Sequence, residues 1–551
     1  MRARLLPLVF LLPLLSLGIS PVQEVLNVDA RASPLDTKLR QLVHESMEEW
    51  HVPGISIGVV DGDEFWAEAT TASLLTNTQG YGIASFPDTP VTPSTLFYGA
   101  STTKAFTSAA LALLISHPTN FTSLSWKTPV SSLIPSDFVL EDEWATSHLT
   151  IEDILSHRTG MPRHDLSYGG HYEGRNATPE DIVRALRYLP MTEEPRVRWQ
   201  YCNMMYTAAS YLLETLTGMS LGDFLRESIW EPLGMSSTYF SNEDAFASPS
   251  HLAQGYVHHN GTYQKVPYMD TRPVSGAGSI ISNVQDYSKW LHALINESPP
   301  IPKDAYKSLF TPRMLMDRND DSLLPYTGPE SYSLGWVTSV YRGHQFYEHS
   351  GGMEAFGAQI IFFPELKYGL CSFGNTGVTS NNVELKAIWK LIDDKLGVPP
   401  KERFDWDKKQ VTIFPFLVFR KQMQSGKEQY DNRTAQYYPK IPSPPLPPTL
   451  PLEDYAGTYF QPAYRNVTIY KEQGVLKAHR DDVSWKLMFD LEHISGDYFM
   501  AHIDSTTAPG LIFRQAVAAE FKVGSDGVAN GFGIAIEPEM GLEGRIWFER
   551  V

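Results

Sequence analysis

One pair of residues has the types and spacing of a catalytic pair: Ser101-Thr102-Thr103-Lys104, the only Ser-x-x-Lys in the sequence. It opens an apolar stretch, FYGASTTKAFTSAALALL, whose composition predicts a helix over 106–115. Because residues three apart share a helix face, the amine can lie over the hydroxyl. An amine that accepts a proton turns a serine hydroxyl into a nucleophile. About one such pair is expected by chance, where it is only a polar helix start, so other motifs must support this chemistry.

A second motif with acid–base potential is Tyr201-Cys202-Asn203. The side chains of Tyr201 and Asn203 are expected to point the same way. A tyrosine acts as a base only if its pKa of about 10 is lowered, which an adjacent ammonium group can do. The amide of Asn203 can orient a lysine or a substrate carbonyl. The alternative is an ordinary tyrosine of the core or its rim.

The third motif is His349-Ser350-Gly351-Gly352, which precedes an apolar strand. Glycines let a substrate lie against a strand edge. A backbone N–H from Gly352, together with one from Ser101, could stabilise a developing oxyanion. The alternative is a surface turn with His349 in solvent.

The elements that must position these motifs alternate along the chain. Strand patterns at both ends of the first two thirds, with helical patterns between them, predict one sheet closed by N- and C-terminal segments, with a helical insertion. Helices are predicted at 35–50, 206–217 and 286–294, and strands at 51–60, 333–340, 358–363 and 368–373. A proline-rich linker, 439–451, then precedes short strands that predict a small antiparallel barrel or sandwich: 466–470, 475–479, 498–503, 510–514, 519–523 and 531–536.

The three motifs occur in one order with PGISIGVV, LSHRTGMP, EPLGM followed by Thr238, GAGSIISNVQD and YSLGW. In this ordered set the chain resembles the serine β-lactamase and penicillin-binding-protein superfamily, in its class C β-lactamase, D-aminopeptidase and esterase branch. The resemblance covers about residues 37–397. The tail from Tyr455-Ala456-Gly457-Thr458-Tyr459 looks like the lipocalin-like C-terminal domain of some members.

The resemblance implies an α+β fold: a β-lactamase/transpeptidase-like domain, with an antiparallel sheet flanked by helices and a helical subdomain, followed by a small all-β barrel-like domain. The expected organisation is a signal peptide (1–20), a catalytic domain (35–397), a connecting and proline-rich segment (398–451) and a lipocalin-like domain (452–551).

The resemblance also implies a role for each motif. Ser101 would be the acylated nucleophile, Lys104 would accept its proton or hold Tyr201 ionised, and Tyr201 would be the base for acylation or deacylation. Asn203 would position the substrate carbonyl, and the N–H groups of Ser101 and Gly352 would form the oxyanion hole. The other members of the third motif, His349, Ser350 and Gly351, would contribute to the substrate-binding wall.

His349 takes the place of the lysine in the Lys-Thr-Gly motif of true β-lactamases. Histidine is largely neutral at pH 7 and anchors a carboxylate less well than lysine does. We therefore expect weak β-lactamase activity and a serine hydrolase of esters, amides or small peptides. An acyltransferase with the same acyl-enzyme chemistry, or a non-catalytic binding member of the fold, are the alternatives. No metal or organic cofactor is needed, and the expected partner is a small-molecule or peptide substrate.

Composition places the chain in a compartment and excludes some partners. With 45 basic and 63 acidic residues the net charge is −18, and the absence of a basic run argues against nucleic acid. Arg2 and Arg4 precede an apolar stretch too short for a stable membrane span, so a secreted protein is expected. Cys202 and Cys371 are expected to be buried free thiols. Glycosylation is expected at Asn120, Asn176, Asn260, Asn296, Asn432 and Asn466.

Overall fold

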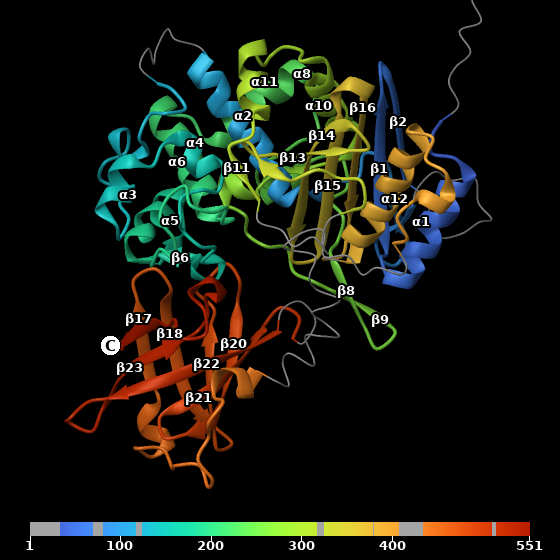
Figure 1. The fold of residues 1–551 in the computed structure, drawn as a ribbon. Helices are drawn as coiled ribbons and strands as arrows, with labels where there is room; N and C mark the ends of the chain where they lie inside the picture. The colour runs from blue at the N-terminus through green and yellow to red at the C-terminus, as the bar shows by residue number, and fades with distance from the viewer. Residues whose placement is uncertain are drawn as a thin grey trace, which may run out of the picture.

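The computed structural model places a large α+β domain above a small β-barrel (Figure 1). It describes residues 33–69, 81–116, 124–172, 174–316, 324–377, 379–406, 433–509 and 514–551. The leader expected at 1–20 lies outside these residues. None of the helices among the described residues is both long and apolar enough to cross a membrane.

A ten-stranded sheet forms the centre of the first domain. Its order is β11-β12-β13-β14-β15-β16-β1-β3-β4, with β2 also paired to β1, and every pairing is antiparallel. The first strand pairs with a late one, Ile57 opposite Ser372, so both ends of the domain close one sheet, as the sequence predicts. The strands are β1 (Gly54–Asp61), β2 (Glu64–Ala69), β3 (Tyr81–Ser85), β4 (Thr89–Pro90), β11 (Met314–Leu315), β12 (Ser331–Tyr332), β13 (Val337–Tyr341), β14 (His344–Met353), β15 (Phe356–Phe363) and β16 (Tyr368–Gly374).

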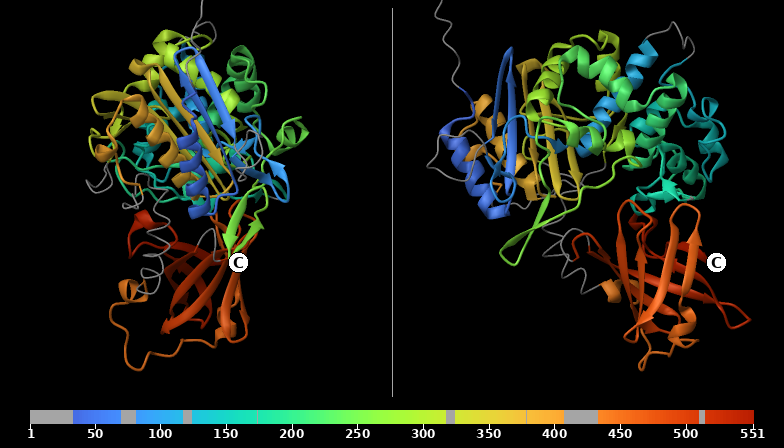
Figure 2. Two further views of the ribbon diagram at one scale, coloured as in Figure 1. Left: turned by 90° about the vertical axis from the view of Figure 1, so that its right-hand side faces the viewer. Right: turned by 180° about the vertical axis from the view of Figure 1, so that it is seen from behind.

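Helices cover both faces of this sheet, and a helical subdomain extends from one side (Figures 1 and 2). On one face α1 and α12 bury an apolar cluster, and α2 and α10 pack within the larger cluster on the other face. Aspartate and asparagine caps begin several helices; Asp36 accepts from the Leu39 N–H at the start of α1. The helices are α1 (Thr37–Trp50), α2 (Thr103–Ser116), α3 (Glu143–His148), α4 (Ile151–Leu155), α5 (Pro179–Ala185), α6 (Asn203–Thr217), α7 (Leu221–Leu225), α8 (Glu231–Leu233), α9 (Asn242–Ala247), α10 (Val284–Asn296), α11 (Lys303–Phe310) and α12 (Thr379–Lys395).

The second domain is a closed barrel in which each strand pairs with its neighbour in sequence. Closure comes from the first and last strands, where Tyr459 lies opposite Arg550. Inward-facing residues alternate with outward ones, and the apolar interior of the barrel joins the larger cluster of the first domain. Its strands are β17 (Gly457–Gln461), β18 (Arg465–Glu472), β19 (Val475–Arg480), β20 (Leu487–Ser495), β21 (Tyr498–Ser505), β22 (Arg514–Val523), β23 (Ala529–Ile534) and β24 (Ile546–Arg550).

The fold class predicted from the sequence is confirmed, with local differences. Of the two predictions for the tail, the structure forms the barrel and not the sandwich. The strand expected at 519–523 forms the second half of β22, whose pairing with β21 begins at Arg514. Of the strand expected at 510–514, residues 510–513 lie outside the described part of the chain. The motif around His349 lies within β14, and not in a turn ahead of a strand.

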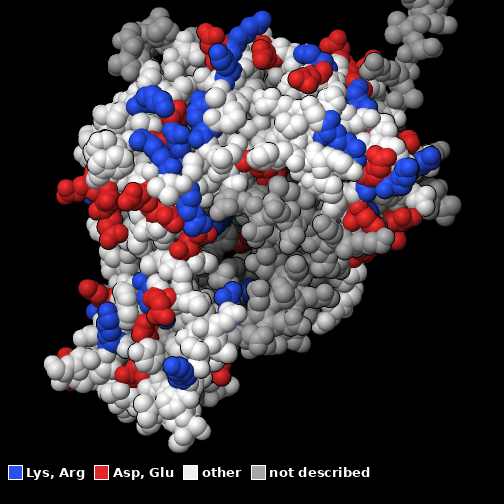
Figure 3. All heavy atoms as spheres, viewed as in Figure 1, with Lys and Arg blue, Asp and Glu red and all other residues white. Residues whose placement is uncertain are grey.

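Charged groups of both signs are interspersed over the face seen in Figure 3, in the part drawn in colour. This distribution agrees with the acidic net charge, and it offers no extended basic surface on that face.

Within the described residues, three two-stranded ribbons lie outside the main sheet. One of them, β5 (Phe97–Tyr98) with β10 (Ile281–Ser282), leads directly into the Ser-x-x-Lys motif. The others are β6 (His171–Tyr172) with β7 (Arg175–Asn176), and β8 (Tyr256–His259) with β9 (Thr262–Lys265).

The barrel is docked on the helical side of the first domain through backbone and side-chain hydrogen bonds (Figure 2). The Gly170 N–H donates to the Asp482 carbonyl at 2.7 Å, and the Ser484 N–H donates to the Tyr168 carbonyl at 2.9 Å. This pairing joins the β19–β20 loop to the segment that follows the LSHRTGMP motif. The two domains therefore share one interface close to the predicted catalytic residues.

Candidate active site

Ser101 lies in a tight turn at the start of α2. The Gly99 N–H stabilises this turn by donating a hydrogen bond to the Ile280 carbonyl at 2.7 Å. Ala100, immediately before the serine, has φ of 46°, a left-handed conformation that a residue with a Cβ adopts only under constraint. The turn presents Ser101 to a cavity at the domain interface, while Thr102 is buried in the core.

Lys104 lies one helical turn further on and is fully buried. Its Nζ is 3.1 Å from Ser101 Oγ, 2.7 Å from Asn203 Oδ1 and 2.9 Å from the Ala277 carbonyl oxygen. Burial lowers the pKa of Lys104 well below its usual range, and the nearby Arg163 charge lowers it further. The helical spacing predicted from the sequence thus brings the amine onto the hydroxyl.

Tyr201 completes the predicted group, and its ring lies close to Lys104 and Arg163. Lys104 Nζ lies 4.8 Å from its ring centroid and Arg163 Cζ lies 4.9 Å from it. Burial raises the pKa of Tyr201, and a hydrogen bond with the Ser101 side chain only partly opposes this. The tyrosine is therefore neutral at physiological pH, and of the two roles written for Lys104, proton acceptor fits these electrostatics better than holding a tyrosinate.

Asn203 is the first residue of α6, and its amide is engaged at both ends. Its Oδ1 accepts from Lys104, and its Nδ2 donates to Asp165 Oδ1 at 2.9 Å. Asp165 in turn accepts from Arg163 Nε at 2.7 Å. The contact of Asn203 with a substrate carbonyl stays a prediction, because the amide already holds the lysine.

Arg163 and Asp165 are functional residues that sequence reasoning did not select. They directly follow the LSHRTGMP segment, which is the one local signal that could have found them. Both line the same cavity as Ser101. Their ion pair places a carboxylate where it fixes the orientation of the amide that contacts Lys104.

His349 lies behind the cavity wall and is not among the residues that line it. Its Nδ1 donates to the Ser350 carbonyl at 2.7 Å, which leaves Nε2 to accept from the Tyr332 hydroxyl at 2.9 Å. Burial and the charge of Lys104 lower the pKa of His349 to about 3. The imidazole is therefore neutral, and this position supplies no cation for a substrate carboxylate.

The rest of the third motif does line the cavity: Ser350, Gly351 and Gly352. A Cβ on Gly351 would lie 2.4 Å from the Gly99 carbonyl oxygen, so only glycine lets β14 approach the serine turn this closely. Asn381, another residue not selected from the sequence, donates through Nδ2 to the Gly351 carbonyl at 3.0 Å and fixes the strand there.

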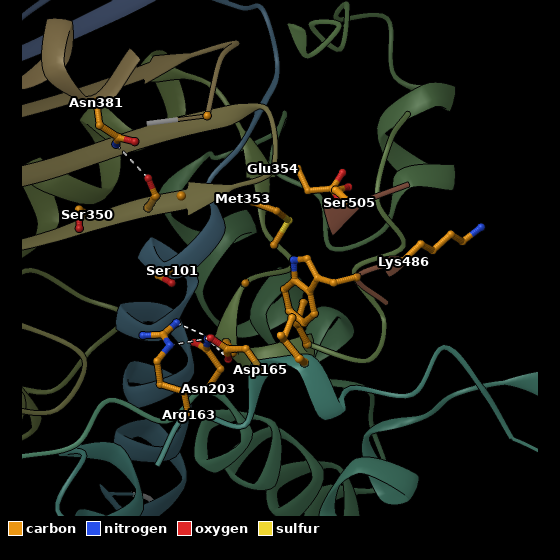
Figure 4. A pocket seen from close by; sticks show the side chains of 18 of the residues that line it. Ser101, Arg163, Asp165, Asn203, Ser350, Met353, Glu354, Asn381, Lys486 and Ser505 are labelled. Carbon is orange, nitrogen blue, oxygen red and sulfur yellow. Dashed lines mark hydrogen bonds and ion pairs between the residues drawn. The ribbon is translucent and has the colours of Figure 1, made fainter. Parts of the chain in front are cut away.

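The cavity has a volume of about 240 Å³ and is built by both domains. Figure 4 shows Ser101 on one side of it and Met353, Glu354 and Ser505 on another. Burial raises the pKa of Glu354 to about 7, with Lys486 opposing the shift. Polar side chains thus gather around the serine, whereas the wall away from it combines the apolar Met353 with the polar Glu354 and Ser505.

Two predictions outside the cavity can also be placed. Cys202 and Cys371 are both buried and unpaired, as expected. The side chains at Asn176, Asn260 and Asn466 are exposed, and Asn296 is half-buried. Asn120 and Asn432 lie outside the described residues.

The fold and this site define a serine hydrolase, in which a buried amine of low pKa lies beside a serine that follows a strained residue, Ala100. The model of the family described as "Beta-lactamase" matches residues 39–391, and that of the "Domain of unknown function (DUF3471)" matches residues 442–550. The chain belongs to the β-lactamase family, and its barrel is a domain of the second kind.

Relatives that span nearly the whole chain carry a shared name. Unguisins hydrolase ungD' of Aspergillus campestris is 42% identical over 522 residues, covering 94% of this chain and 92% of the relative. Unguisins hydrolase ungD of Aspergillus violaceofuscus is 40% identical over 549 residues, covering 95% and 92%. Among solved structures, the octameric penicillin-binding protein homologue from Pyrococcus abyssi has a TM-score of 0.55 at 20% identity, covering 93% of this chain and 99% of its own. That last likeness speaks for the fold alone.

Proposed function

We propose that the chain hydrolyses an ester or amide bond, in a small-molecule or peptide substrate, through an acyl-enzyme on Ser101. The three contacts of Lys104 Nζ carry this proposal. Two of them, Asn203 Oδ1 and the Ala277 carbonyl, only accept hydrogen bonds, so they use both N–H groups of a neutral amine. The lone pair is then left for the third neighbour, the Ser101 hydroxyl, 3.1 Å away.

The reaction follows from this arrangement. Ser101 Oγ attacks the substrate carbonyl carbon while its proton passes to Lys104 Nζ, and the N–H groups of Ser101 and Gly352 stabilise the oxyanion. The intermediate collapses as the leaving group takes that proton, with the Tyr201 hydroxyl, hydrogen bonded to Ser101, as a relay. Water then attacks the carbonyl carbon of the acyl-enzyme and gives one proton to Lys104 Nζ, and the amine passes this proton to Ser101 Oγ as the acid leaves, which restores both residues.

The substrate class is proposed from the relatives and the cavity together. Two relatives that span more than nine tenths of the chain are named unguisins hydrolases, so we propose an unguisin or a related compound as substrate. Slow β-lactam turnover is expected as well, because the neutral His349 offers a β-lactam carboxylate no cation. Efficient nitrocefin hydrolysis would contradict this part of the proposal.

Intact mass after incubation with a p-nitrophenyl acyl ester tests the nucleophile. The wild-type chain is expected to gain one acyl group, and Ser101→Ala none. Ser350→Ala is the matched control, because it removes another hydroxyl of the same cavity and should still be acylated. An adduct on Ser101→Ala, or neither adduct nor turnover in the wild type across esters, amides and unguisins, would overturn the proposal and favour a binding protein.

We also propose that the chain is secreted. The support is the leader pattern at 1–20 and the exposed sequon side chains at Asn176, Asn260 and Asn466. A mass loss on treatment of the native protein with an N-glycosidase tests this, and a native chain that retains its leader inside the cell would contradict it.

A further inference from the structure

The wall of the cavity away from the predicted nucleophile is supplied in part by the C-terminal barrel. Trp485, Leu487 and Ser505 of the barrel line the same cavity as Ser101. They come from the β19–β20 loop, the start of β20 and the end of β21, and Leu487 lies opposite Ser505 in the barrel ladder. One end of the barrel thus closes the space into which a substrate would enter.

The loop that carries Trp485 is held firmly against the catalytic domain. Its backbone pairs with the 168–170 segment through the Ser484 N–H and the Asp482 carbonyl. The Trp485 ring also meets Tyr168 edge to face, with centroids 5.5 Å apart. The indole is therefore placed at the cavity by contacts on both sides of the interface, and substrate binding need not order it first.

The base of this loop is fixed by a buried arginine. Arg480 is 1% exposed, and its Nη1 donates to the Leu166 carbonyl at 2.9 Å. Leu166 also lines the cavity, next to the Arg163–Asp165 ion pair. The hydrogen bond from Arg480 to Leu166 thus docks the barrel and fixes Leu166 at the cavity. It also anchors the end of β19, from which the loop with Trp485 continues.

The chemistry of this wall selects for an apolar group. Trp485 and Leu487 from the barrel line the cavity together with Met353 from the tip of β14 (Figure 4 labels Met353). The polar residues on the same side are Glu354, Lys486 and Ser505, so the apolar cluster forms one part of this wall. On the serine side, Arg163 and Asp165 form an ion pair with each other. Their charges therefore offset one another and do not attract a charged group of the substrate. Apolar walls with few polar groups are what small-molecule sites use to bind bulk and to exclude water.

We propose that Trp485 is a specificity-determining residue, and that the wall it forms with Leu487 and Met353 receives an apolar group of the substrate. The barrel then selects the substrate and is not only attached to the enzyme. This inference rests on the proposed acyl-enzyme function, because it assumes that the reacting carbonyl lies at Ser101.

The test compares selectivity and not activity. The ratio of kcat/KM for p-nitrophenyl octanoate to that for p-nitrophenyl acetate is measured in the wild type, Trp485→Ala and Trp485→Phe. A parallel series compares 1-naphthyl acetate with phenyl acetate, so that an apolar leaving group is tested as well. Trp485→Ala is expected to lower at least one of these ratios about tenfold, as for lost apolar contacts in a substrate pocket, and Trp485→Phe to restore most of it.

A matched control separates substrate contact from loosened docking. Gln461 donates to the Tyr188 carbonyl at 2.8 Å across the same interface, but it does not line the cavity. Gln461→Ala should keep both ratios. If it lowers them as much as Trp485→Ala does, or if Trp485→Ala keeps both ratios, the inference is wrong.

A binding measurement distinguishes failure of the inference about Trp485 from failure of the proposed acyl-enzyme function. If the wild type turns over no ester, the proposed function fails, and calorimetric binding of N-methyloctanamide still tests the wall. Affinity about tenfold weaker for Ser101→Ala/Trp485→Ala than for Ser101→Ala supports it. Equal affinity in the two variants overturns it.

Discussion

Truncation of Asp165 should weaken catalysis although its side chain does not reach the serine. Its Oδ1 accepts from Asn203 Nδ2 at 2.9 Å and fixes that amide with its oxygen on Lys104. A hydrogen bond to a charged group contributes about 1.5–3 kcal/mol. Because the Asp165 side chain is 22% exposed, water replaces part of it, and the lower end applies. We expect kcat/KM of Asp165→Ala to fall about tenfold, since each 1.4 kcal/mol is about a factor of ten.

The assay is ester turnover with purified variants of matched melting temperature. Asp165→Asn keeps a neutral acceptor for Asn203 and should lose only about threefold. In Asn203→Ala the amide that Asp165 orients is already gone, so adding Asp165→Ala should cost little more. The reasoning is refuted if Asp165→Ala keeps wild-type kcat/KM, or if the two substitutions are fully additive.

Three further predictions concern the strand, the base and the interface. Gly351→Ala should destabilise the fold by about 1–3 kcal/mol and lower kcat, because its Cβ would meet a carbonyl at 2.4 Å, whereas Gly352→Ala meets nothing within 4 Å and should keep the melting temperature. Tyr201→Phe should lower kcat about a hundredfold but keep the acidic limb of the pH–rate profile if neutral Lys104 is the base; loss of that limb would assign it to the tyrosine. Burial raises the pKa of Glu537 to about 7 from 4.5, so its protonated form stabilises the fold at low pH and this is lost as the pH rises toward 7. As the pH rises from 4.5 to about 7, the melting temperature of Glu537→Gln should therefore fall less than that of the wild type. An equal fall in the two proteins would contradict this effect of Glu537.

The elements that the sequence predicts well are those whose patterns are local. The helix after Ser101 and the buried strand β15 show as short apolar runs, and the helix that begins at Asn203 shows its periodicity within a few residues. β14 was less evident, because it contains glycines and a buried charge: Glu348 is 2% exposed and accepts from Gln359 Nε2 at 2.9 Å. A polar pair between neighbouring strands gives no apolar alternation for sequence analysis to detect.

The site residues also divide into those that a local sequence pattern predicts and those that it does not. The proximity of Ser101 and Lys104 follows from helical spacing, which is a local property. Asp165 and Trp485 could not be placed, because their positions depend on an interface between distant parts of the chain. Likewise, the neutral state of His349 depends on its burial and on the proximity of Lys104, which no local pattern reports.

The barrel and the catalytic lysine are linked through one loop. The Glu537 carboxylate accepts from the His164 N–H at 2.7 Å, so the barrel holds the residue directly before Asp165. Asp165 holds Asn203, and Asn203 holds Lys104. Since each contact in this relay constrains the next, docking of the barrel and orientation of the amine are coupled in free energy. A substrate that fills the cavity touches Asp165 and Asn203 in the middle of this relay, and Trp485 and Leu487 of the barrel, so its binding should stabilise the docked barrel as well as occupy the serine.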